Sequence, residues 1–411
     1  MPPTIRRIGF FTLALAGGLV VLAGVGWAIA HEANRGIRSA ILHARLGAAV
    51  EKALLESGIY IKEGDFARLP DITLEFDEDY TSGTLTIQNH PHLDKALNKL
   101  CISSCLEHYV AYQHYLSDDE NHYIFELSDS RQQRQLVFNS ADVFLTHSRE
   151  MCGDYELSID GKNKIPLHNY LIVGQIGSGK TYALYSLILQ MLDKSVPYEL
   201  YFADPKASSL AVLGDAISPV NTAESIEEIV DLLHVFHKKM IQRKAEIKER
   251  LSEKLDGTYA DFGLTPHVMI LDEYASFIAQ INAMERKERD AILAPLKTII
   301  LEGRQLGFIL WIVMQKSDAN TISTDIRDNM PGKFVLGQSE KTTYETCFGA
   351  SAHIPKRRYQ PGQGVFAYPG ITQADLPRLC HFPTLHFNVL GAVKAAFRGD
   401  EPGESQAQPP S

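Results

Sequence analysis

The longest apolar stretch of the chain lies close to its start. Residues 8–30 include no charged side chain, and a helix of these 23 residues would measure roughly 34 Å, enough to cross a bilayer. Arginines flank the stretch at Arg6, Arg7, Arg35, Arg38 and Arg45. The pattern predicts one transmembrane helix, with the C-terminal side cytoplasmic by the positive-inside bias. A cleaved signal peptide is the alternative, because Ala28-Ile29-Ala30 resembles a cleavage site, although the apolar run exceeds a usual signal core.

Mixed helical and alternating patterns follow in residues 31–150. Apolar positions recur at helical spacing in some segments and alternate with polar ones in others, which indicates a small α+β module. The predicted helices are Glu32–Ser57 and Leu93–Leu116, and the predicted strands are 72–76, 84–87 and 123–127.

A third pattern begins near residue 151 and continues to about 395. Short, unbroken apolar runs, typical of buried parallel strands, alternate with helical segments, which predicts an α/β domain. The runs are 170–173, 200–203, 267–271 and 308–314. Residues 182–192 predict a helix, and 238–254 an exposed helical face with both charge signs. The polar, proline-rich residues 396–411 predict a disordered tail.

The first apolar run of this domain leads directly into a phosphate-binding motif. The segment satisfies G-x-x-x-x-G-K-[ST], and a helical pattern follows it. Backbone N–H groups of such a loop, together with the positive end of the helix dipole, hold phosphates. The motif comprises Gly174, Gln175, Ile176, Gly177, Ser178, Gly179, Lys180 and Thr181. Lys180 would reach the β- and γ-phosphates and Thr181 would ligate Mg²⁺, so ATP and Mg²⁺ are the expected ligands.

Two later strands end in side chains suited to ATP hydrolysis. The run 267–271 ends at Asp272 and Glu273. We expect Asp272 to hold Mg²⁺ and Glu273 to act as the general base that activates the attacking water. Gln315 follows the run 308–314, and the carboxyl ends of parallel strands share one sheet edge, so Gln315 should face the γ-phosphate.

Composition and cysteine usage fit a cytosolic body behind the anchor. The chain has 411 residues, enough for two domains, and its five cysteines show no disulfide framework. Cys101, Cys105 and His108 would share one face of the predicted helix, as a metal site would require. The favoured interpretation is instead that this face, which continues from Leu97, is buried in the core. The net charge is −10, so the chain lacks the overall positive charge that is typical of nucleic-acid-binding domains. Any basic surface must therefore be confined to part of the molecule.

Several motifs in order resemble the FtsK/SpoIIIE family of DNA-pumping ATPases, over roughly residues 165–370. Beyond the P-loop and the acidic strand, the resemblance rests on Phe202-Ala203-Asp204-Pro205-Lys206, Glu302-Gly303-Arg304-Gln305-Leu306-Gly307-Phe308, Val313-Met314-Gln315-Lys316 and Asp328-Asn329-Met330-Pro331. It implies a RecA-like fold and a homo-hexameric ring, with nucleotide at subunit interfaces and DNA in the central pore. It also makes Arg304, and secondly Arg327, candidates for an arginine supplied in trans to the transferring phosphoryl group. A surface salt bridge is the alternative for either arginine.

Departures from the family pattern indicate which subgroup of the FtsK/SpoIIIE family this chain resembles. We expect one membrane span, no long linker, no C-terminal winged helix and no all-helical insertion in the motor. This organisation resembles the compact, TcpA-type coupling proteins of Gram-positive conjugative elements. It implies a membrane-anchored, ATP-driven DNA translocase of conjugative transfer, with a relaxase and transfer-channel proteins as partners. The basic run 356–358 is a candidate phosphate contact or a solvated loop.

Three other functions stay open from the sequence. A protein-secretion ATPase of the type VII kind shares these motifs but usually has several motor domains in one chain. A chromosome-segregation translocase would carry a sequence-reading domain. A non-motor receptor would use ATP only to assemble or release a relaxase–DNA complex.

Overall fold

The computed structural model describes two compact units, divided after Gln132. The described residues are 36–63, 66–131, 135–317, 321–355, 357–372 and 375–398. The predicted transmembrane segment 8–30 lies outside them. None of the helices within these ranges is both long and apolar enough to cross a membrane. The predicted tail starts inside the last described helix, and its residues 399–411 also lie outside the described ranges.

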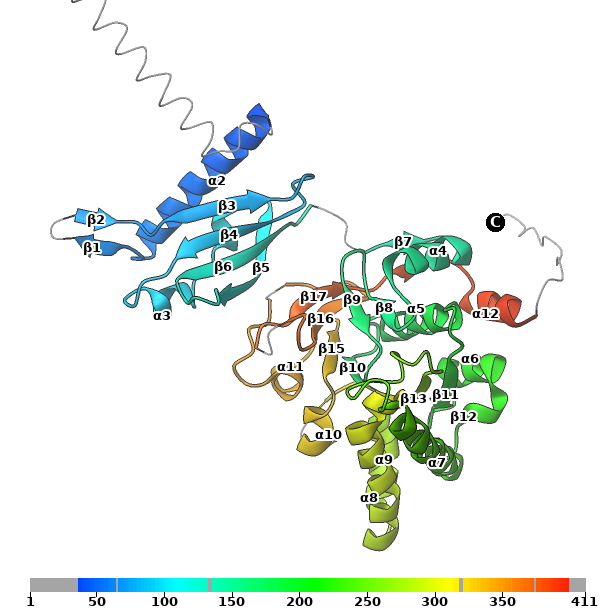
Figure 1. Cartoon of the computed structure of the whole chain (residues 1–411). Coiled ribbons are helices and arrows are strands. Elements are labelled where there is room, and N and C mark those ends of the chain that lie inside the picture. Colours follow the sequence, from blue (N-terminus) through cyan, green and yellow to red (C-terminus); the bar gives the residue numbers. More distant parts are fainter. Residues whose placement is uncertain are drawn as a thin grey trace, which may run out of the picture. The chain divides into compact units, whose positions relative to one another are not determined.

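The first unit is a four-stranded antiparallel sheet with one long helix (Figure 1). Helix α2 buries Leu46, Val50 and Leu54 in one core with Leu85 and Phe125 of the sheet. The sheet has the order β3-β4-β6-β5. The elements are α2 (Ile37–Glu56), β1 (Ile61–Glu63), β2 (Phe66–Arg68), β3 (Ile72–Phe76), β4 (Ser82–Gln88), α3 (Asp94–Leu97), η2 (Ser103–Cys105), β5 (Tyr109–Leu116) and β6 (His122–Asp129).

The predicted helix over residues 93–116 is wrong. The segment forms only the short α3 and η2, and its last third is β5, which pairs with β6 and contains a bulge between Ala111 and Gln113. The three tyrosines of β5 favour a strand when a partner strand is present, and here the partner overrides the helical spacing. Cys101, Cys105 and His108 therefore share no helical face. No cluster of metal-ligating side chains occurs in the described part of the chain.

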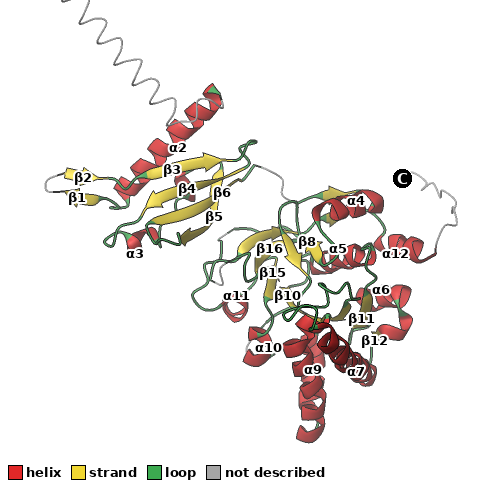
Figure 2. Cartoon of the chain, viewed as in Figure 1, coloured by secondary structure: helices red, strands yellow, loops and turns green. Residues whose placement is uncertain are grey.

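The second unit is built on an eight-stranded sheet with the order β12-β11-β13-β14-β10-β15-β16-β17 (Figure 2). The strands from β12 to β15 are parallel, and β16 and β17 are antiparallel. The strands are β10 (Tyr170–Gly174), β11 (Glu199–Ala203), β12 (Thr222–Ala223), β13 (His267–Leu271), β14 (Phe308–Met314), β15 (Gly332–Leu336), β16 (Gln363–Ala367) and β17 (Arg378–His381). All four predicted motor strands are confirmed.

Helices cover this sheet. Two of them, α7 and α9, pack against each other, and α12 packs against α6. The helices are α4 (Ala141–Met151), α5 (Lys180–Leu192), α6 (Ser209–Ile217), η3 (Pro219–Asn221), α7 (Ile226–Arg250), α8 (Tyr274–Ala283), α9 (Arg286–Leu306), α10 (Thr324–Asp328), α11 (Lys341–Phe348) and α12 (Val389–Arg398). Short strand pairs complete the unit: β7 (Val137–Phe138) with β18 (Thr384–Leu385), and β8 (Glu156–Ser158) with β9 (Lys164–Pro166).

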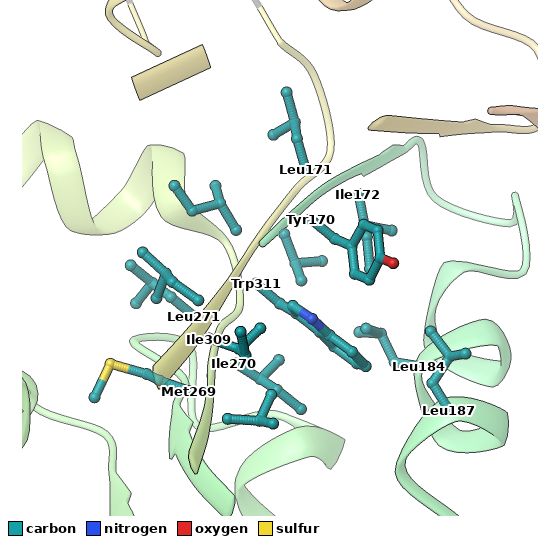
Figure 3. Close-up of a cluster of buried hydrophobic side chains, with 14 of the residues drawn as sticks. Tyr170, Leu171, Ile172, Leu184, Leu187, Met269, Ile270, Leu271, Ile309 and Trp311 are labelled. Carbon is teal, nitrogen blue, oxygen red and sulfur yellow. The ribbon is translucent and has the colours of Figure 1, made fainter. Parts of the chain in front are cut away.

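Part of the core of the second unit lies between the central strands and helix α5 (Figure 3). Trp311 of β14 is fully buried, and its indole N–H donates to the His168 carbonyl at 3.0 Å. Leu184 and Leu187 of α5 pack in the same cluster. Every residue of β10, β13 and β14 is buried, which explains their unbroken apolar sequences.

The boundary between the units differs from the expected one near residue 150. Helix α4 belongs to the second unit because its polar face bonds to α5 and the turn after it. The Ser148 hydroxyl donates to Gln190 at 3.0 Å, and Arg149 pairs with Asp193 at 2.6 Å. Phe144 adds an edge contact with Phe138.

Candidate nucleotide site

The P-loop connects β10 to α5 at the carboxyl edge of the sheet. Gly177 and Gly179 have φ values of 82° and 85°, in the left-handed region where a Cβ is unfavourable. A Cβ on Gly177 would meet no atom within 4 Å, so the loop has open space beside it. The Ser178 hydroxyl is buried and has no hydrogen-bond partner in the described structure. Glycine torsions, open space and an adjoining helix N-terminus are what a phosphate-binding loop needs.

A second loop supports the P-loop, which the sequence alone did not indicate. The Gly362 N–H donates to the Ser178 carbonyl at 2.7 Å. A Cβ on Gly179 would lie 2.2 Å from the Gly362 nitrogen, so the two backbones are in direct contact. The Pro361-Gly362 dipeptide is a turn signal that would have placed a loop here. Nothing in the sequence pattern would have indicated that this loop contacts the P-loop.

Asp272 lies at the end of β13 and faces the P-loop lysine. The Lys180 ammonium is 3.6 Å from Asp272 Oδ1, and both side chains are largely buried. Burial raises the pKa of Asp272, and the Lys180 charge opposes that rise. Asp272 Oδ1 also accepts the Glu273 N–H at 2.9 Å. A buried carboxylate beside a P-loop lysine is suited to a divalent cation on the phosphates.

Glu273 follows with a backbone in the left-handed region, at φ 45° and ψ 56°, immediately before α8. Its side chain is only 8% exposed and forms an ion pair with Lys206, with Oε2 and Nζ 2.7 Å apart. Lys206 belongs to the Asp204-Pro205-Lys206 motif, which contributes to the family resemblance without predicting a role for Lys206.

The Asp204 carboxylate fixes the turn that carries Lys206. Asp204 is fully buried and accepts the N–H groups of Lys206 at 3.1 Å and Ser208 at 2.8 Å. It also accepts the Ser208 hydroxyl at 2.6 Å. Helix α6 begins at the next residue, so Asp204 anchors both the turn and the helix start.

Gln315 directly follows β14, which lies between β13 and β10 in the sheet. Leu271 pairs with Ile312, and Val173 pairs with Met314, so the three strands end at one edge. The structure therefore brings together four predicted features: the P-loop, Asp272, Glu273 and Gln315.

Neither candidate arginine joins this group. Arg304 lies near the end of α9, where Gly303 allows close approach: a Cβ there would be 2.0 Å from the Phe308 carbonyl oxygen. Phe308 begins β14, so Arg304 lies at the amino edge of the sheet. Burial and then the Arg304 charge lower the pKa of His168, at the start of β10, to about 4. A five-residue strand separates this edge from the P-loop by roughly 16 Å.

Arg327 is also distant from the P-loop. It lies in α10, ahead of the first residue of β15, and pairs with Asp328 at 2.9 Å. Of the basic run 356–358, Arg357 and Arg358 are exposed in the loop between α11 and β16, and Lys356 is outside the described residues.

The residues present at the carboxyl edge fit Mg²⁺ and ATP. The loop amides and Lys180 would hold phosphates, and the exposed Thr181 and the partly buried Asp272 would hold the metal ion directly or through water. The open space at Gly177 leaves room for phosphate oxygens.

Comparison with known proteins gives consistent matches. Residues 127–306 match the model of the FtsK/SpoIIIE family. The FtsK domain-containing protein YdcQ of Bacillus subtilis is 29% identical over 245 residues, covering 60% of this chain and 49% of that protein. The DNA translocase FtsK of Staphylococcus epidermidis is 25% identical over 219 residues, covering 49% of this chain and 26% of that protein. The chain thus spans less than half the length of these two curated relatives.

Among solved structures, the pCW3 conjugation coupling protein TcpA, in its monomer form with ATPgS, is also similar. The match covers 82% of this chain and 95% of that chain, at 15% sequence identity and a TM-score of 0.49.

Proposed function

We propose that this chain is an ATP-driven DNA translocase of the FtsK/SpoIIIE family, whose model its residues 127–306 match. The observation that carries the proposal is the convergence of the P-loop, Asp272, Glu273 and Gln315 at one sheet edge. That group contains a phosphate cradle, a metal-binding acid, a base and a polar side chain beside the γ-phosphate position.

The residues divide the chemistry between them. Lys180 would leave Asp272 and bind the β- and γ-phosphates, and Thr181 and Asp272 would hold the metal ion. A bound Mg²⁺ would neutralise charge on the phosphate oxygens. Glu273 accepts the proton of the water that attacks the γ-phosphorus, and ADP leaves. Gln315 orients that water or senses the loss of the phosphate.

Arginine assistance comes from another subunit in this proposal. Arg304 and Arg327 lie at the edge opposite their own P-loop, so neither serves the site of its own subunit. In a homo-hexameric ring, the amino edge of one subunit would meet the carboxyl edge of the next. An arginine there would stabilise charge on the transferring phosphoryl group.

The cargo and the biological setting are further parts of the proposal. The chain would deliver DNA to a conjugative transfer channel as a coupling protein, with a relaxase as partner. The support is that the described part of the chain contains a small α+β unit and a P-loop unit. Residues 8–30 would anchor the protein in the cell membrane, with the motor cytoplasmic. Recovery of mature protein beginning at His31 from cells would contradict the anchor.

The deciding experiment asks which polymer stimulates ATP hydrolysis. Turnover of the purified full-length chain is measured alone, with duplex or single-stranded DNA, and with an unrelated polypeptide; Lys180→Ala is the inactive control. Stimulation by DNA alone supports the proposal. Stimulation by polypeptide alone favours a type VII-like export ATPase. Equal turnover in all mixtures favours a receptor that uses ATP only for assembly.

The conjugative setting needs a test in cells. Transfer frequency of the mobile element is compared between strains carrying the wild-type chain and Lys180→Ala. A drop to background with the variant supports a coupling role, whereas unchanged transfer contradicts it and leaves chromosome segregation as the alternative.

A further inference from the structure

The two acids at the end of β13 each have a lysine partner. Lys180 of the P-loop lies 3.6 Å from Asp272, and Lys206 lies 2.7 Å from Glu273. The proposed mechanism gives three of these residues a task at the triphosphate: Lys180 on the phosphates, Asp272 at the metal ion and Glu273 on the water. Lys206 is the fourth charged member of the group; the family resemblance includes its motif without giving it a role, and the mechanism does not use it.

The backbone beneath Lys206 is fixed while its ammonium is accessible. The buried Asp204 carboxylate holds the turn through the N–H groups of Lys206 and Ser208. The Lys206 side chain is 45% exposed, whereas that of its partner Glu273 is 8% exposed. Lys206 therefore presents a cation at the end of a flexible four-carbon arm, anchored at a defined position beside a buried carboxylate.

The distance to Glu273 places that cation near the γ-phosphate. A general base must lie within hydrogen-bond reach of the attacking water, and that water adjoins the γ-phosphorus. An ammonium in contact with Glu273 Oε2 is therefore within a few ångströms of the γ-phosphate oxygens. A terminal phosphate carries more negative charge than a carboxylate and attracts the same cation more strongly.

We propose that Lys206 is a second phosphate-binding lysine, which exchanges Glu273 for the γ-phosphate when ATP binds. This inference rests on the proposed function, because it takes Glu273 as the general base. The exchange would parallel that of Lys180, which leaves Asp272 for the phosphates. It would also free Glu273 Oε2 to accept the proton of water. ADP has no γ-phosphate, so the Lys206–Glu273 pair stays closed with ADP bound.

The test is the difference between ATP and ADP in binding, measured without turnover. Full-length wild-type chain and the Lys206→Met variant are titrated calorimetrically with Mg²⁺ and either ADP or a non-hydrolysable ATP analogue. Methionine keeps the length of the arm and removes the charge. We expect ADP affinity within about twofold of wild type and a loss of about tenfold or more in the preference for the ATP analogue, the size of a charge-assisted hydrogen bond.

Two further variants sharpen the result. Lys206→Arg keeps the cation and should retain most of the preference for the ATP analogue. Lys244→Met removes a lysine from a comparable ion pair on α7, 2.7 Å from Glu302, and should change neither affinity. Thermal unfolding of each variant checks that the fold is intact.

Two outcomes overturn the inference. They are affinities for the analogue and for ADP that are both unchanged in Lys206→Met, and an equal loss of affinity for both nucleotides. Either would leave Lys206 a structural partner of Glu273. Failure of the proposed function appears separately, as ATP hydrolysis that DNA does not stimulate.

Discussion

At the nucleotide site, Glu273 has a backbone conformation that is unfavourable for a non-glycine residue. A non-glycine residue in the left-handed region costs on the order of 1–2 kcal/mol. Glu273 bears this cost at the end of β13 with its carboxylate buried and paired with Lys206. Strain of this kind persists where the surroundings enforce it, and it gathers at active sites. A carboxylate retained at such a position therefore supports a chemical role for Glu273.

The first prediction concerns that carboxylate. Glu273→Gln should bind ATP and lose hydrolysis by about 10²–10⁴-fold, because an amide does not accept the proton of the attacking water. ATP affinity and turnover are measured in parallel, with Glu288→Gln on the exposed first turn of α9 as the control. Wild-type turnover in Glu273→Gln would remove Glu273 from the role of general base.

The second prediction concerns His168 at the amino edge. Burial, and then the Arg304 charge, lower its pKa to about 4, below the roughly 6.5 of an unfolded histidine. As pH falls from 6.5 towards 4, the unfolded chain binds a proton that the folded chain does not, so stability decreases across this window. His168→Gln should reduce that decrease, measured as urea unfolding at several pH values. His234→Gln, on the exposed side of α7, should leave it unchanged; identical slopes for all three proteins would contradict the prediction.

At the scale of elements, the sequence predicts strands and motifs that depend on neighbouring residues. It does not predict contacts between segments that are far apart in the sequence. The runs 267–271 and 308–314 are recognisable because strands buried on both faces have no polar interruptions. The segment 93–116 misleads because β5 is a strand only beside β6. The P-loop, Asp272 and Glu273 follow from short motifs at strand ends. The Lys206–Glu273 pair joins two strands far apart in the sequence, so only the fold reveals it.

The third prediction tests the loop that supports the P-loop. Gly362 has φ +83°, and a Cβ there would lie 2.7 Å from Gln135 Nε2 and 3.1 Å from the Phe382 carbonyl oxygen. Gly362→Ala should lower stability by about 1–2 kcal/mol through its backbone torsion alone and should also weaken nucleotide binding, because its N–H holds the Ser178 carbonyl.

A matched control separates these two effects. Gly370 has nearly the same torsion, φ +84°, with no atom within 4 Å of an added Cβ. Gly370→Ala should lose stability through the same unfavourable backbone torsion and should keep the nucleotide affinity of the wild type. Equal nucleotide affinities in the two variants would show that the supporting loop does not shape the P-loop. Nucleotide titration and chemical denaturation supply both readouts.

At the scale of the whole molecule, the described chain has one unit with the candidate nucleotide site and a small α+β unit that gives no chemical motif. Neither unit has an element recognisable as a reader of base edges in the major groove. A translocase needs only phosphate contacts, which position DNA without reading its sequence. The exposed Arg357 and Arg358 are candidates for such contacts within the motor.

The fourth prediction follows from that absence of a reader in the described residues. DNA binding by the full-length chain should be weak, nearly independent of sequence and steeply weakened by salt, because phosphate contacts release counterions. Several unrelated duplexes and single strands are titrated at two salt concentrations. A preference of about 1000-fold for one sequence, as specific readers show, would contradict the prediction.

The positions of the two arginines lead to a genetic consequence. Suppose that Arg304 at the amino edge of one subunit completes the nucleotide site of the next subunit. The substitution Arg304→Ala then damages the neighbour's site, whereas Glu273→Gln damages the site of the subunit that carries it. Arg304→Ala subunits and Glu273→Gln subunits are each inactive alone. Mixed in one ring, some sites would pair an intact Glu273 with an intact Arg304 from the neighbour, and hydrolysis would return to a fraction of the wild-type rate. Complementation between two inactive alleles is thus the expected phenotype, whereas a mixture as inactive as its components would mean that Arg304 does not act across the interface.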